Sequence, residues 1–113
     1  MLTLDALKGF GANADEGLAR CMNNETFYLG LVATVLTDAK LSELGEALDA
    51  GDLDKAFDLA HALKGMYGNL SLDPLFKPVN EMTELLRSRT QTDYSALYSE
   101  AKAQMEKLRA LSE

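Results

Sequence analysis

The sequence has few of the residues on which metal centres and disulfide frameworks depend. Among its 113 residues there is one cysteine and one histidine. Cys21 cannot form an internal disulfide and has no partner at metal-ligand spacing, so we expect a reducing compartment. Asp58 and His61 have the i, i+3 spacing of di-metal sites in helical bundles, but such sites need a second histidine and further carboxylates. We therefore expect no metal site.

Positive charge is also scarce. Eleven lysines and arginines stand against eighteen aspartates and glutamates, which gives a formal net charge of −7. A protein with this charge is repelled by the phosphates of nucleic acids and by anionic membranes. We therefore expect neither nucleic acid nor a membrane as a partner.

Long apolar runs are absent. The longest apolar stretch, around residues 27–36, is too short to span a bilayer. The first ten residues contain Asp5 and lack the basic start and apolar run of a secretion signal. With 47% apolar residues and no tandem repeat, the chain suffices for one bundle core over residues 1–113. We expect a cytoplasmic monomer.

Helical periodicity is present throughout, and no segment alternates like a strand. Capping residues divide the chain into successive helices. In residues 25–36, Phe27 and Tyr28 begin an apolar pattern that we expect to face the bundle core. Asp73 is the expected cap of a helix with Pro74 in its first turn, which continues through Pro78. The other expected helices are 4–10, about 14–22, one around 41–48 closed by Gly51, 53–70, and about 93–111. These elements predict an all-α, up-down antiparallel four-helix bundle with short extra N-terminal helices packed outside it.

The helix expected at 53–70 carries the only histidine at the edge of its apolar face. Lys64, Gly65 and Gly68 follow His61 at +3, +4 and +7, so they lie along the same edge. Each glycine inside a helix costs about 1 kcal/mol relative to alanine. One explanation is that Gly65 is a left-handed cap and Gly68 lies in a loop. The other is that the helix continues, because Tyr67 keeps the apolar phase, and that missing side chains let a partner approach the imidazole.

The run Ala60-His61-Ala62-Leu63-Lys64-Gly65, followed by Gly68 and residues 69–75, resembles the histidine-containing phosphotransfer (HPt) domain family. The resemblance covers about residues 25–87. It implies that His61 accepts a phosphoryl group from one receiver-domain aspartate and returns it to another, so the chain is a phosphocarrier and not an autonomous enzyme. It also implies a response-regulator receiver domain or a hybrid histidine kinase as partner. No cofactor is expected on this chain, and Mg²⁺ is expected on the receiver.

Two positions depart from the family pattern. Ser71 stands ten residues after the histidine, where the family often has glycine. Thr83 stands where family members often present a glutamine that bonds the histidine ring. We include Thr83 with Lys64, Gly65 and Gly68 as candidate support for the phosphate or for docking, although its side chain is shorter.

The residues themselves suit phosphoryl transfer. An imidazole is largely neutral at cytoplasmic pH, so a ring nitrogen has a lone pair that can attack phosphorus. Lys64, one turn away, would offset the charge of the phosphoryl group. The alternative is a helical adaptor that docks a receiver domain or another partner without being phosphorylated.

Overall fold

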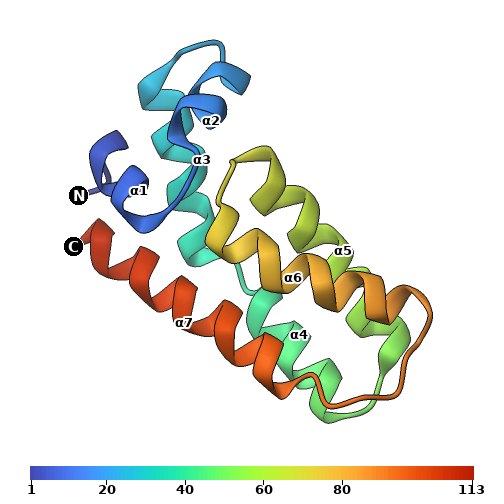
Figure 1. Cartoon of the computed structure of the whole chain (residues 1–113). Helices are drawn as coiled ribbons and strands as arrows, with labels where there is room; N and C mark the ends of the chain where they lie inside the picture. The colour runs from blue at the N-terminus through green and yellow to red at the C-terminus, as the bar shows by residue number, and fades with distance from the viewer.

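The computed structural model describes every residue from Met1 to Glu113 and contains helices but no strands (Figure 1). This confirms the predicted all-α class. The helices in chain order are α1 (Leu4–Phe10), α2 (Ala14–Arg20), α3 (Glu25–Thr37), α4 (Lys40–Asp49), α5 (Leu53–Asn69), α6 (Asp73–Arg87) and α7 (Ser95–Ser112).

The bundle is built from antiparallel neighbours. α5 packs between α4 and α6, and α6 packs on α7. α4 lies against the first half of α7, where Gly45 meets Tyr98, and α3 lies against α7 nearer its C-terminus (Figure 1). The short helices α1 and α2 sit at that same end. The predicted bundle with extra N-terminal helices is therefore the observed architecture.

Side-chain caps begin most of the helices where the sequence predicts. Thr3, Asn13, Asn24 and Asp52 each accept a hydrogen bond from a backbone N–H in the first turn of the helix that follows. Each such cap contributes about 1 kcal/mol. The predicted cap of α6 is wrong: Asp73 is its first helical residue and makes no capping bond.

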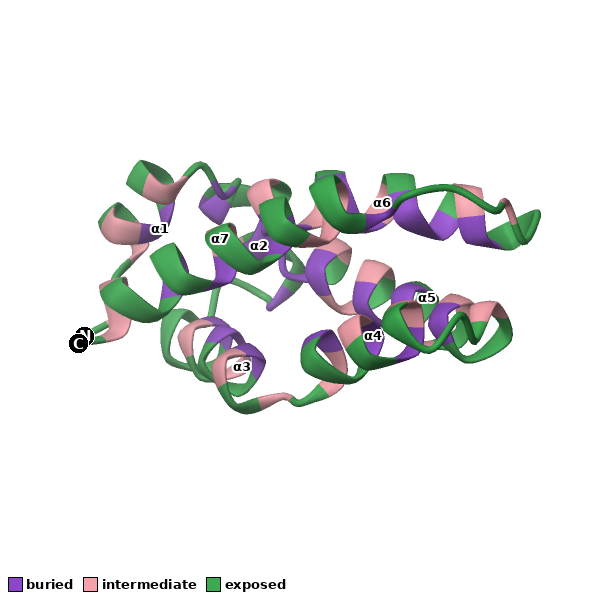
Figure 2. Cartoon of the chain, turned by 90° about the horizontal axis from the view of Figure 1, so that it is seen from below, coloured by how far each residue is buried: buried purple, intermediate pink, exposed green.

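α3 departs from its predicted packing. Its buried residues are Tyr28, Val32 and Val35, whereas Phe27 is 54% exposed. The apolar arc of α3 is wider than the surface that its neighbours cover, so the residue at the edge of the arc faces solvent. Figure 2 shows the buried faces of the longer helices turned towards one another.

Tyr28 holds the short helix α2 beside the end of α5. Its hydroxyl donates a hydrogen bond to the carbonyl oxygen of Leu70 at 2.8 Å. A Cβ at Gly17 of α2 would lie 2.5 Å from the Tyr28 ring, so the absence of a side chain there lets α2 pack closely. Burial raises the pKa of Tyr28 to about 12, so this hydroxyl remains a donor at physiological pH.

Candidate functional site

α5 is continuous through both of its glycines. It runs from Leu53 to Asn69, so the explanation of Gly65 as a left-handed cap is wrong. The left-handed residue is Ser71, with φ of 56°, and the N–H of Leu72 donates to the Tyr67 carbonyl across this turn. A non-glycine residue in this conformation costs about 1–2 kcal/mol. Ser71 nevertheless adopts the left-handed conformation, at the position where the family pattern often has glycine.

His61 lies on the exposed edge of α5, midway along the helix. Its ring is 5.7 Å from the ring of Phe57, between centroids, with 33° between the planes. The imidazole takes part in none of the side-chain hydrogen bonds of the chain. Its nitrogens are therefore free to meet a partner.

Lys64 is held by an acidic residue of the neighbouring helix. Its Nζ donates to Oε1 of Glu84 at 3.1 Å, and Nε of Arg87 donates to Oε2 of the same carboxylate at 3.3 Å. The hydrogen bond from Lys64, followed by that from Arg87, lowers the pKa of Glu84 below its usual range. The Arg87 guanidinium also lies 5.4 Å from the centre of the Phe57 ring, a cation–π contact. His61, Phe57, Arg87, Glu84 and Lys64 thus surround one patch of the α5–α6 surface.

An open groove of about 410 Å³ lies beside His61, and we call it the histidine groove. Three predicted site residues, Lys64, Gly65 and Gly68, line it together with His61. The rest of its lining is Asn69, Ser71, Asp73 and Phe76 from the end of α5 and the start of α6, and Glu16 and Arg20 from α2.

The two glycines of the groove differ in their surroundings. A Cβ at Gly65 would have nothing within 4 Å, whereas a Cβ at Gly68 would lie 3.3 Å from the ring of Phe76. Packing therefore explains part of the need for glycine at 68. Nothing in the free chain explains glycine at 65, where alanine would favour the helix.

In a comparison with protein families, the model described as Hpt domain matches residues 35–111. The chain belongs to the Hpt domain family. Comparisons with curated proteins and with solved structures gave no match. Membership indicates a histidine phosphotransfer role, since Hpt domains are phosphocarriers that interact with receiver domains and kinases. The matched residues contain α4 to α6 and most of α7, while α1, α2 and most of α3 lie outside them.

Thr83 is not part of the site in this Hpt domain. It is fully buried, and its hydroxyl donates to the Val79 carbonyl at 2.7 Å. A threonine inside a helix readily forms this bond to the carbonyl four residues earlier. We therefore correct the prediction that Thr83 supports the phosphate or bonds His61.

Sequence reasoning missed several residues around His61. The spacing of Phe57 places it on the apolar face of α5, and the ring does pack partly against the core, but it also lies beside the imidazole. Glu84 and Arg87 meet α5 because α6 runs back antiparallel to it. The short connection expected between the helix at 53–70 and the one beginning near Asp73 could have indicated that pairing. Arg20 and its ion-pair partner Glu16, at 2.7 Å, come from α2, and no local pattern connects them to His61.

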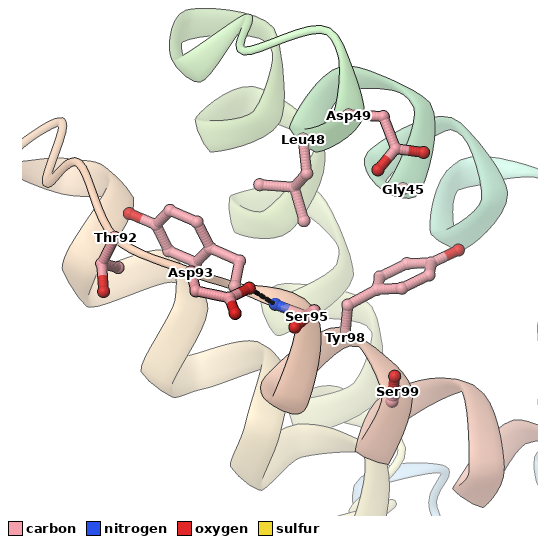
Figure 3. A pocket seen from close by; sticks show the side chains of 9 residues that line it. Gly45, Leu48, Asp49, Thr92, Asp93, Ser95, Tyr98 and Ser99 are labelled. Carbon is pink, nitrogen blue, oxygen red and sulfur yellow. Dashed lines mark hydrogen bonds between the residues drawn. The ribbon is translucent and has the colours of Figure 1, made fainter.

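A second cavity lies elsewhere in the Hpt domain. It has a volume of about 230 Å³ and is formed by the end of α4 and the start of α7 (Figure 3). Asp93 accepts a hydrogen bond there from the N–H of Ser95 at 2.9 Å, and the Tyr98 ring occupies the space that a side chain at Gly45 would fill. The cavity shares no residue with the histidine groove and contains no cationic side chain.

Two further findings concern the whole chain. No three histidine, cysteine, aspartate or glutamate side chains converge so that they could hold a metal ion. None of the helices combines the length and apolar character that a membrane span requires.

Proposed function

We propose that this Hpt domain carries a phosphoryl group on His61 and exchanges it with receiver-domain aspartates in a two-component phosphorelay. The observation that carries the proposal is the position of the only histidine. Its imidazole is exposed on a rigid helix, one turn from Lys64, and borders an open groove. Exposure without internal hydrogen bonds is what a residue that reacts with another protein requires.

The chemistry needs little from this chain. The lone pair of a neutral ring nitrogen attacks the phosphorus of the receiver's aspartyl phosphate, and an N–P bond forms as the O–P bond breaks. The aspartate leaves as a carboxylate, the second ring nitrogen keeps its proton, and the reverse reaction passes the group on. Lys64 offsets the charge of the phosphoryl oxygens. The proposal assigns Mg²⁺ to the receiver, since catalysis of phosphoryl transfer is mainly positioning and charge stabilisation.

The docking surface in this proposal is the histidine groove and its continuation. A neighbouring groove of about 330 Å³ shares Arg20 and Asn69 with it and is bordered by the exposed ring of Phe27 and by Leu31. An exposed aromatic residue at the border of a groove is a typical anchor of a protein interface. The partner is the receiver domain of a response regulator or of a hybrid histidine kinase.

In this proposal the chain acts as a monomer in the cytoplasm, where receiver domains exchange phosphoryl groups. Cys21 supports a reducing compartment, because it is buried and unpaired.

The deciding experiment incubates the chain with a ³²P-phosphorylated receiver domain. We expect acid-labile, alkali-stable label on the wild type and none on His61→Gln. The melting temperature of this variant should stay within about 2 °C of the wild type, because exposed substitutions change stability by less than about 0.5 kcal/mol. Binding of the receiver without transfer of label would instead support the adaptor. A large loss of stability in His61→Gln would assign a structural role to the histidine.

A further inference from the structure

The cation next to His61 along α5 is already engaged in the unphosphorylated chain. The Lys64 side chain is 29% exposed, and its amine bonds Glu84 of α6 at 3.1 Å. Glu84 is bonded on its other oxygen by Arg87, so one carboxylate restrains Lys64 and a cation of its own helix. The charge that would stabilise a phosphoryl group is thus partly neutralised before the group arrives.

We infer that Glu84 is a positioning residue that lowers the stability of phosphorylated His61 by competing with the phosphoryl group for Lys64. The inference rests on the proposed function. An ammonium group has three donors and can bond both anions, but the carboxylate and the phosphoryl oxygens then repel each other around it. Glu84 therefore raises the free energy of the phosphorylated state relative to the free state.

This arrangement suits a carrier that must release what it accepts. If Lys64 were free of Glu84, it would hold the phosphoryl group more firmly, and transfer to the next aspartate would be less favourable. A glutamate is ionised at neutral pH, and the hydrogen bonds from Lys64 and Arg87 lower the pKa of Glu84 further. The ion pair between Glu84 and Lys64 thus shifts the equilibrium of phosphoryl transfer from His61 towards the receiver aspartate.

The chain offers a matched control for removing this charge. Glu106 of α7 accepts a bond from Arg109, three residues later, at 3.0 Å, just as Glu84 pairs with Arg87 at i, i+3. Both glutamates are about half exposed, but only Glu84 is bonded to Lys64, whereas Glu106 pairs with Arg109 alone. Glu84→Gln and Glu106→Gln therefore change the net charge equally and each removes one i, i+3 ion pair, but only Glu84→Gln also removes the carboxylate that is bonded to Lys64.

The measurement is the equilibrium ratio of phosphorylated Hpt domain to phosphorylated receiver after the two are mixed. A change in docking alone alters the rate of approach but not this ratio. We expect Glu84→Gln to shift the ratio two- to fivefold towards the Hpt domain, the range set by the energy of an exposed ion pair. Glu106→Gln should leave the ratio unchanged, and Glu84→Asp should stay closer to the wild type than Glu84→Gln.

A double-mutant cycle tests whether Glu84 acts through Lys64. In the Lys64→Ala background, Glu84→Gln should shift the ratio much less than in the wild type. Equal ratios for Glu84→Gln and Glu106→Gln, or an undiminished shift in the Lys64→Ala background, would overturn the inference. These outcomes are separate from failure of the proposed function, in which no receiver would label the wild type at all.

Discussion

Gly65 is the position where stability and function should respond in opposite directions. It lies inside α5, four residues after His61, and a side chain there would enter open space. Replacing it with alanine or glutamine tests whether the missing side chain serves a partner. Gly68 is a less suitable position for this test, because a side chain there would also press on Phe76 at 3.3 Å.

The expected gain in stability follows from the surroundings of Gly65. Its φ is negative and no atom lies within 4 Å of the added Cβ, so no strain offsets the helix propensity. Gly65→Ala should stabilise the fold by about 0.5–1 kcal/mol, which is roughly 2–4 °C in melting temperature for a chain of this length. Gly65→Gln should gain about as much, because glutamine is also a good helix former.

The expected loss is in phosphotransfer. A glutamine side chain at 65 would stand in the histidine groove, so transfer from a labelled receiver should slow about tenfold or more. Gly30 provides the control, since it is also an exposed helical glycine with nothing within 4 Å and it lines no groove. Gly30→Gln should gain the same stability without slowing transfer. Unchanged transfer in Gly65→Gln would refute a docking role for this glycine, and a lower melting temperature for Gly65→Ala would refute the stability argument.

Two further variants test the other parts of the proposed surface. Lys64→Ala should lower the rate of phosphorylation or shorten the lifetime of phosphohistidine, whereas Lys64→Arg should keep much of the effect, and superimposable time courses for all three proteins would leave Lys64 without a role. Phe27→Ser should weaken receiver binding about fivefold or more in calorimetry while costing only about 1 kcal/mol of stability, because the ring is half exposed. Unchanged affinity would exclude the continuation of the groove from the interface.

Local patterns in the sequence determined the helices and the position of the histidine. Caps such as Asn24 and Asp52 act within one turn, so the residues that form them are adjacent in sequence. The phase of Tyr67 predicted that α5 continues past Gly65, and the helix does so. The edge shared by His61 and Lys64 follows from 3.6 residues per turn, which needs no knowledge of the partner helices.

The tertiary structure decided what surrounds that edge, because the relevant contacts join residues far apart in sequence. The packing of α6 buried Thr83 in the core and brought Glu84 to Lys64. The close approach of α2 to Tyr28 brought Arg20 to the histidine groove. The apolar arc of α3 was readable from its periodicity, but which part of it stays uncovered depends on where the neighbouring helices lie. Phe27 is exposed for that reason.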